Sequence, residues 1–224
     1  MVFACREGVL ISRTKAINEL KSLIVVAPEH QRAQLRGRSL SVQLTRIEQL
    51  HISATAPVEH RLSVFSLQSI AARVRFLSAQ LAELDPQLLA LIKQHPAGPN
   101  LLAEPGVGPV VAAQLLISWS HHGRVRSEAA FASLAGVSPI ETSSGQRSRH
   151  RLNRGGDRAL NRALHTVAIT RLRCHPESIA YEIKRTAQGK THRDIRRSVK
   201  RALARRLYRR IEDAIRRDNI SIVA

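Results

Sequence analysis

Two adjacent serines and a glycine precede a cluster of basic residues in the C-terminal half of the chain. Ser143, Ser144 and Gly145 are followed by Arg147, Arg149, His150, Arg151, Arg154 and Arg158. A serine hydroxyl is a small nucleophile, glycine leaves room for a close backbone approach, and guanidinium groups hold phosphate oxygens. This combination predicts chemistry on the phosphodiester of a DNA strand rather than DNA binding alone.

Each of these side chains also has a simpler interpretation from the residues alone. Serine beside glycine is a common turn or capping residue, and a serine nucleophile needs a base or a metal ion to activate it. His150 could relay a proton, or it could be an exposed histidine that contacts phosphate. The arginines could form a solvated basic face, but the distribution of charge favours phosphate contact.

The charge of the chain points to a polyanionic partner. The 224 residues carry a formal charge of +19, and 22 of the 36 Lys and Arg residues but only 8 of the 17 Asp and Glu residues lie in residues 140–224. We therefore expect the phosphate-facing surface in this C-terminal part. Aromatic residues make up only 3% of the chain, which argues against a base-stacking platform for single strands.

A membrane surface is the competing polyanion. No segment is long and apolar enough to span a bilayer, and the N-terminus lacks the pattern of a signal peptide, so the sequence predicts a cytoplasmic protein without a membrane partner. Cys5 and Cys174 are far apart in sequence. They fit reduced thiols rather than a disulfide framework or a zinc site.

The N-terminal part reads as helices with a long leucine stripe. Helices are expected over residues 3–26, 29–35 and 40–52, followed by a periodic segment over 58–95. Its apolar positions recur in steps of three and four at Leu67, Ile70, Val74, Leu77, Leu81, Leu84, Leu88 and Leu91. Such a stripe fits either a coiled-coil arm or a core helix of a bundle. Pro86 predicts a kink or a restart.

A glycine turn follows a candidate domain boundary at residues 96–100, which read as a loop. In residues 101–116, two apolar segments flank Gly106-Val107-Gly108. This pattern indicates a helix-hairpin-helix, in which the glycines let the turn approach a DNA backbone so that helix N-terminal amides bind a phosphate. A glycine turn between two core helices is the alternative.

The remaining C-terminal elements are helices around one irregular segment. Ser127 caps a short helix through Leu134, and the serine stretch lies in a loop or hairpin. Asp157 begins a helix with Leu160, Leu164, Val167 and Leu172 on its buried side, and another helix begins at Pro176. The last helix, from Thr191 to about Arg217, is expected to show its arginines outward, among them Arg197, Arg201 and Arg205.

The order of these motifs is similar to that of one family. The quoted segments are 131–139 (FASLAGVSP), Ser143-Ser144-Gly145, 153–164 (NRGGDRALNRAL) and Gln188-Gly189-Lys190 before a basic helix. Together with the glycine turn they resemble the IS-one-ten family of bacterial insertion-sequence transposases. The resemblance runs over nearly the whole chain and is strongest from Leu102 to Leu164.

The resemblance implies a recombinase that is guided by a structured bridge RNA and cuts and rejoins DNA through a covalent phosphoserine. It places the nucleophile on Ser143, with Ser144 as the alternative. Members of the family also have an N-terminal RuvC-like domain whose four acidic residues bind Mg²⁺. We find no such acidic set in this chain, so we expect no metal site of its own and a chain that starts near the end of that domain.

We therefore predict a mainly α protein in three parts: a helical remnant at 1–57, a coiled-coil-like arm at 58–95, and a transposase domain at 96–224 with a helix-hairpin-helix and the serine hairpin. The predicted partners are DNA, a guide RNA, and a second copy or a full-length transposase bound through the arm. The predicted nucleic-acid contacts are Gly106, Gly108, Arg147, Arg149, His150, Arg151, Arg154, Arg158, Arg197, Arg201 and Arg205. A non-catalytic nucleic-acid-binding remnant and a structural oligomer are the alternative functions.

Overall fold

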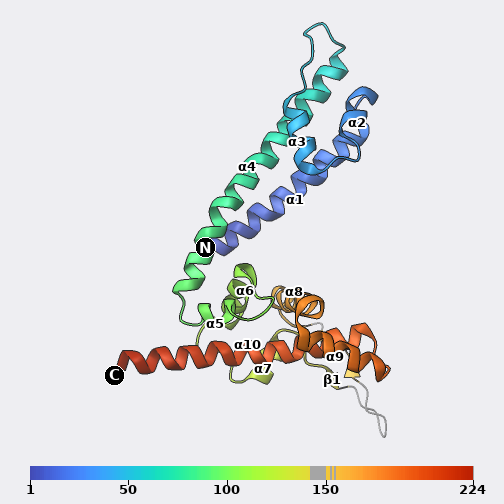
Figure 1. Ribbon diagram of the computed structural model, residues 1–224. Coiled ribbons are helices and arrows are strands. Elements are labelled where there is room, and N and C mark those ends of the chain that lie inside the picture. Colours follow the sequence, from blue (N-terminus) through green and yellow to red (C-terminus); the bar gives the residue numbers. More distant parts are fainter. Residues whose placement is uncertain (142–149, 152, 154, 224) are drawn as a thin grey trace. The chain divides into compact units, whose positions relative to one another are not determined.

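The computed structural model describes residues 1–141, 150–151, 153 and 155–223, and these residues form a mainly α fold (Figure 1). The predicted fold class is therefore confirmed. The chain divides into two compact units, Met1–Gln87 and Leu88–Ala224. The division falls inside one long helix, α4 (Val58–Gln94). The three-part division at residues 57 and 95 stays a prediction.

The first unit contains α1 (Val2–Val26), α2 (Glu29–Leu35), α3 (Leu40–Glu48) and most of α4. Side chains far apart in sequence join α1 to α4: Arg6 pairs with Asp85, Arg13 donates to Ser78 Oγ, and Glu19 pairs with Arg73. Because the α1 numbers rise as the α4 numbers fall, the two helices run antiparallel, as Figure 1 shows.

The leucine stripe of α4 is partly buried within its own unit. Leu67, Ile70 and Val74 belong to one apolar cluster with Leu20 of α1 and Ile47 of α3. The core-helix interpretation therefore holds for this part of the stripe, whereas Leu91 is 49% exposed. Pro86 lies inside α4, so the predicted restart of the helix at this residue is wrong. Proline at this site removes one backbone donor without ending the helix.

The second unit is a cluster of helices around α10. Its elements are α5 (Gly98–Leu102), α6 (Pro109–Trp119), α7 (Glu128–Leu134), β1 (Ile140–Glu141), β2 (His150–Arg151), α8 (Arg158–Cys174), α9 (Pro176–Ala187) and α10 (His192–Val223). In Figure 1, α10 runs beneath α5 and α8 as the longest helix of the unit, and it packs against α5, α7, α8 and α9. Its predicted buried side is confirmed, because Ile195, Val199, Leu203, Leu207 and Ile211 are all buried.

Two predicted helix starts are confirmed by their capping bonds. The Ser127 hydroxyl accepts from the Ala130 amide at 3.2 Å at the start of α7. Asp157 Oδ1 accepts from the Ala159 and Leu160 amides at 2.8 and 3.0 Å at the start of α8. Each oxygen satisfies an amide that has no partner within its helix, which fixes where the helix begins.

Three local predictions are corrected. The predicted loop at 96–100 contains the first residues of α5, which has Pro99 in its first turn, a position where proline costs no hydrogen bond. The third helix ends at Glu48 rather than near residue 52. Leu172 was predicted on the buried side of α8, but its neighbour Arg171 is more deeply buried. Arg171 is only 4% exposed and pairs with a carboxylate inside the fold.

Candidate nucleic-acid interface

The serine segment connects two short paired strands. β1 and β2 are antiparallel, with Ile140 opposite Arg151 and Glu141 opposite His150. The predicted nucleophile Ser143 and its alternative Ser144, with Arg147, Arg149 and Arg154, lie outside the described residues. His150 and Arg151 are described as backbone only. The structure therefore describes the two strands that flank the segment and the residues around them.

The base of this hairpin is held by a close contact between two glycines. Gly136 has a φ of +66°, and a Cβ added to Gly156 would lie 2.4 Å from the Gly136 nitrogen. The Asp157 amide also donates to the Leu134 carbonyl at 2.7 Å. No other residue type fits Gly156 without moving the backbone. The chain before β1 and the chain after β2 are thereby fixed against each other.

A groove lined by basic side chains lies beside the hairpin base. It consists of two adjoining hollows of about 490 and 450 Å³ that share Gly136, Asn153, Arg197 and Lys200. The first hollow reaches Ser138 and Pro139, immediately before β1. The Lys and Arg residues that line one or both hollows are Arg158, Lys190, Arg193, Arg196, Arg197, Lys200 and Arg201. We call this surface the basic groove and the second hollow, which also contains His165, the Lys200 hollow.

The structure brings three of the predicted contacts to this groove. Arg158 begins α8, whereas Arg197 and Arg201 come from α10. Four lining cations were missed by the sequence prediction as specific contacts: Lys190, Arg193, Arg196 and Lys200. Their spacing on α10 could have placed several of them on one face, but the sequence gives no sign that α8 and the α7–β1 turn meet that face.

One hydrogen-bond chain fixes the floor of the Lys200 hollow. Lys200 Nζ donates to Asn161 Oδ1 at 2.8 Å, and Asn161 Nδ2 donates to the Ala135 carbonyl at 2.7 Å. The chain joins α10 and α8 to the residue before Gly136. Because both ends of the Asn161 amide have partners, the ammonium group of Lys200 is held at one place in the hollow.

The electrostatic environment of the hollow is positive. Burial, and then the charges of Arg197 and Arg196, hold the pKa of Lys200 below its ordinary value. Burial, and then Lys200 and Arg196, lower the pKa of His165 in the same way. Like charges disfavour the protonated forms of both residues, and a bound anion would relieve that repulsion.

The glycine turn has two different glycines. Gly106 has a φ of +81°, and a Cβ there would lie 3.3 Å from Thr170 Cβ and from the Val167 carbonyl of α8. The positive φ and the close packing against α8 therefore explain why residue 106 is a glycine. Gly108 is exposed, has a φ of −94° and would place a Cβ in open space. The predicted DNA contact of both residues stays a prediction. Of the two, Gly108 is the one with open space beside its Cα.

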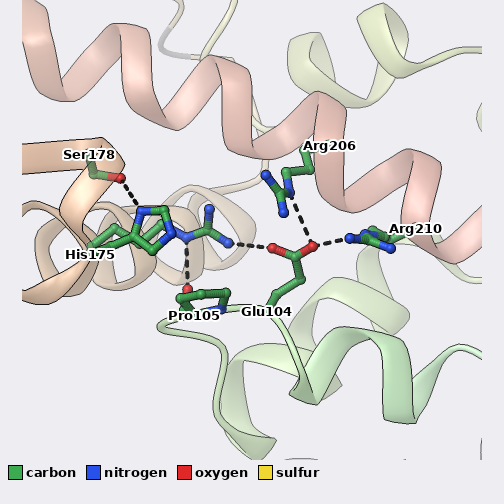
Figure 2. A network of polar contacts seen from close by, with 7 residues as sticks. Glu104, Pro105, His175, Ser178, Arg206 and Arg210 are labelled. Carbon is green, nitrogen blue, oxygen red and sulfur yellow. Dashed lines mark hydrogen bonds and ion pairs between the residues drawn. The ribbon is translucent and has the colours of Figure 1, made fainter. Parts of the chain in front are cut away.

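Next to this turn, one buried carboxylate holds three arginines (Figure 2). Glu104 is 4% exposed. Its Oε2 accepts from Arg171 at 2.6 Å, and its Oε1 accepts from Arg206 and Arg210 at 3.1 and 2.9 Å. Arg171 also donates through Nε to the Pro105 carbonyl at 2.8 Å. The network ties the glycine turn to α8 and α10, and Figure 2 shows Glu104 between Arg206 and Arg210.

The pKa of Glu104 follows from this network. Burial by itself raises the pKa, but the hydrogen bonds from Arg171, Arg206 and Arg210 outweigh burial and hold the pKa below its ordinary value. Glu104 is therefore charged at neutral pH. A charge so deeply buried needs these partners, because an unpaired buried carboxylate is strongly unfavourable.

The expectation that the arginines of α10 point outward is confirmed, because none of its described arginines is buried, but several of them pair with carboxylates. Arg205 and Arg209 pair with Glu128 of α7 at 3.2 and 3.0 Å, and Arg206 and Arg210 pair with Glu104. Arg205, predicted as a nucleic-acid contact, thus has a carboxylate partner within the fold. Arg197 lies 3.4 Å from Asp194 and also lines the groove.

The described side chains and helices also bear on metal binding and membrane insertion. Within the part of the chain that the structure describes, no cluster of three or more His, Cys, Asp or Glu side chains could hold a metal ion. Among the same residues, no helix combines the length and apolarity needed to cross a membrane. The resemblance implies Mg²⁺ for the family's RuvC-like domain, and the expectation that this chain has no metal site of its own stays a prediction.

Comparison with known proteins agrees with the sequence resemblance. Residues 99–182 match the model of the transposase IS116/IS110/IS902 family. The chain is 36% identical over 126 residues to an insertion element IS110 uncharacterized 43.6 kDa protein of Streptomyces coelicolor, which covers 55% of this chain and 31% of that protein. It is 25% identical over 134 residues to an insertion element IS900 uncharacterized 42 kDa protein of Mycobacterium paratuberculosis, which covers 59% and 34%.

The second unit is helical, and through residues 99–182 the chain is similar to the IS110 family of transposases. The matched region includes the glycine turn, the two strands, all of α8 and the first part of α9. The matches span about a third of the length of each of these two curated relatives.

Proposed function

We propose that this protein acts in DNA transposition as a recombinase that cuts and rejoins DNA through Ser143. The observation that carries the proposal is the family match over residues 99–182, a range that includes Ser143 in the sequence and, in the structure, Gly136 to Pro139 of the basic groove. The groove supplies cations next to the residues that lead into β1. Such cations position phosphates and stabilise the charge that develops during phosphoryl transfer.

In the proposed step, the Ser143 oxygen attacks a DNA phosphorus atom. The serine hydroxyl gives up its proton, the new Oγ–P bond forms, and the bond from phosphorus to one deoxyribose oxygen breaks. That oxygen takes up a proton and leaves as a hydroxyl. The protein is then joined to one strand as a phosphoserine, and a hydroxyl from another strand reverses the step and rejoins the DNA.

Among the described residues, no group of three or more His, Cys, Asp or Glu side chains could hold Mg²⁺. We propose that a full-length family member, bound through the arm at residues 58–95 or as part of a mixed oligomer, supplies the acidic half of the machinery. A bridge RNA belongs to the same proposal, because guide and DNA both present phosphates to a basic surface.

The second candidate is a nucleic-acid-binding protein without cleavage activity. It is favoured by one observation: the described residues that line the basic groove already include seven Lys and Arg side chains from outside the 142–149 segment. Binding by the groove would therefore not depend on the serines.

The test is a search for a protein–DNA adduct that survives denaturation. The full chain is incubated with donor and target DNA, guide RNA and Mg²⁺, with and without a full-length relative. Ser143→Ala and Ser144→Ala are compared in parallel. We expect an adduct that Ser143→Ala abolishes and Ser144→Ala retains. The opposite pattern moves the nucleophile to Ser144, and no adduct in any mixture, with DNA binding intact, favours the second candidate.

A further inference from the structure

The Lys200 hollow differs from the other arginine clusters of the second unit in its lack of a carboxylate. Its lining contains Arg158, His165, Arg193, Arg196, Arg197 and Lys200. None of its described lining residues is Asp or Glu. By contrast, Glu104 and Glu128 together take five arginines of α8 and α10 into ion pairs.

Placing several cations around one hollow costs free energy through their mutual repulsion. Among the described residues, no ion pair joins Arg158, Arg193 or Arg196 to a carboxylate. The molecule therefore leaves these charges for something outside the chain. An anion is the ligand class that such a hollow favours.

Lys200 is the best-positioned of these cations. One of its three possible donor hydrogens is used by Asn161, and Asn161 is itself fixed by the Ala135 carbonyl. The other two remain for a ligand in the hollow. Because the position of the ammonium group is set in advance, binding an anion there loses little side-chain entropy.

The shape of the groove favours a polymer over a free ion. The Lys200 hollow holds about 450 Å³ and adjoins the first hollow through Arg197, Lys200, Gly136 and Asn153. Its cations come from α8 and α10, and the first hollow adds Lys190 and Arg201 together with one carboxylate, Asp194. A row of cations along an open groove matches consecutive phosphates of a nucleic-acid backbone.

We propose that the Lys200 hollow binds a backbone phosphate of the DNA strand, with Lys200, Arg193 and Arg196 as its contacts. The proposal rests on the proposed function for the choice of DNA, and it adds residues to which the sequence gave no specific role. Because Gly136 and Asn153 line the hollow and flank the hairpin, the phosphate would lie beside the base of the serine segment. The hollow would therefore set the position of the strand relative to that hairpin.

The experiment measures the affinity of the full chain for labelled duplex DNA over a series of salt concentrations. The test variant is Arg193→Gln with Arg196→Gln, which keeps much of each side-chain stem. The matched control is Arg209→Gln with Arg216→Gln, which removes the same charge from the same helix at positions that line neither hollow. Circular dichroism and unfolding temperature confirm that both variants fold.

We expect the groove variant to lose DNA affinity and to lower the slope of log affinity against log salt by about 1 to 2, since each lost phosphate contact removes about 0.9. The control should keep the slope of the parent protein. Equal loss in both variants, or none in either, overturns the proposal, because net charge alone would then explain binding.

Two further arms separate the ligand sources. If inorganic phosphate alone saturates the hollow of the parent protein at concentrations that leave DNA binding unchanged, the site is a free-anion site and the proposal fails. If the groove variant loses affinity for a single-stranded RNA but not for DNA, the assignment to DNA fails. Ser143→Ala should keep the parent slope, so a failure of the serine chemistry is distinguishable from a failure of this site.

Discussion

Arg206 and Arg210 donate to a buried carboxylate, whereas Arg193 and Arg196 of the same helix line a hollow whose described lining contains none. The residues are identical in type and lie only a few turns apart on α10. Their surroundings differ: the glycine turn brings Glu104 to the first pair, whereas the described residues that line the hollow of the second pair include no Asp or Glu. The first cluster therefore stabilises the fold, and the second is available to a ligand.

Basic composition alone therefore does not locate a binding surface. Arg171, Arg206 and Arg210 all pair with Glu104, and removing Glu104 would leave the buried Arg171 without a counter-charge, which costs several kcal/mol. Exposed ion pairs contribute about 0–1 kcal/mol. Unpaired cations in a groove contribute nothing to stability and, through repulsion, oppose it slightly. Stability and DNA affinity should thus respond to different arginines.

The largest expected effect is the loss of Glu104. Glu104→Gln keeps the shape of the side chain but leaves Arg171 buried without its counter-charge. We expect the free energy of unfolding to fall by about 3–5 kcal/mol, measured by chemical denaturation. The matched control is Glu128→Gln, whose partners are more exposed and whose cost should stay below about 1 kcal/mol. Equal costs for the two variants would remove the distinction between the clusters.

The same contrast should depend on pH. The folded pKa of Glu104 lies below its ordinary value near 4.5, so its charge contributes stability that is fully present above about pH 4.5. That contribution disappears as the pH falls through the folded pKa. Unfolding curves between pH 7 and pH 3 should show the gap between the parent protein and Glu104→Gln closing at the acidic end. A gap that stays constant over this range would mean that the charge of Glu104 is not what stabilises the network.

A smaller loss is expected at the hairpin base. Gly156→Ala places a methyl group 2.4 Å from the Gly136 nitrogen and 2.8 Å from the Leu134 carbonyl, so the backbone must shift. We expect a cost of about 1–3 kcal/mol in unfolding free energy, as for overpacked sites. Gly155→Ala is the neighbouring control, because its nearest atom would be 3.6 Å away. Equal stability of the two variants would contradict the close contact between Gly136 and Gly156.

The smallest effect concerns the groove itself. Lys200→Met removes one of the charges that lower the pKa of His165, so that pKa should rise, as followed by NMR titration of the His165 ring. Arg209→Met, which is outside the groove, should leave the titration unchanged. A falling pKa of His165 in the Lys200 variant would show that the two groups do not share the hollow.

Much of the fold could be predicted from the sequence because helix signals are local. Ser127 and Asp157 cap the helices that they were predicted to cap, and the apolar spacing of Ile195, Val199 and Leu203 identifies the buried side of α10. The errors occur where several elements meet. The first residues of the helix at Gly98–Leu102 were predicted as a loop because they include proline and glycine. Arg171 was not expected inside the core.

The candidate site could be predicted only in part. The family resemblance and the charge direct attention to the C-terminal part, and there Arg158, Arg197 and Arg201 line the groove. The distinction between Arg205, which pairs with Glu128, and Arg196, which faces the hollow, depends on which helix packs against which side of α10. That is a tertiary property, and a periodic pattern on one helix does not contain it.

The most direct test of the division between the clusters is an NMR titration of the arginine side-chain Nε–Hε signals of the full chain with duplex DNA. We predict that the signals of Arg193 and Arg196 shift and gain protection from exchange with water, while those of Arg171, Arg206 and Arg210 stay where they are. Shifts confined to the three arginines around Glu104, with the groove signals unchanged, would contradict the account.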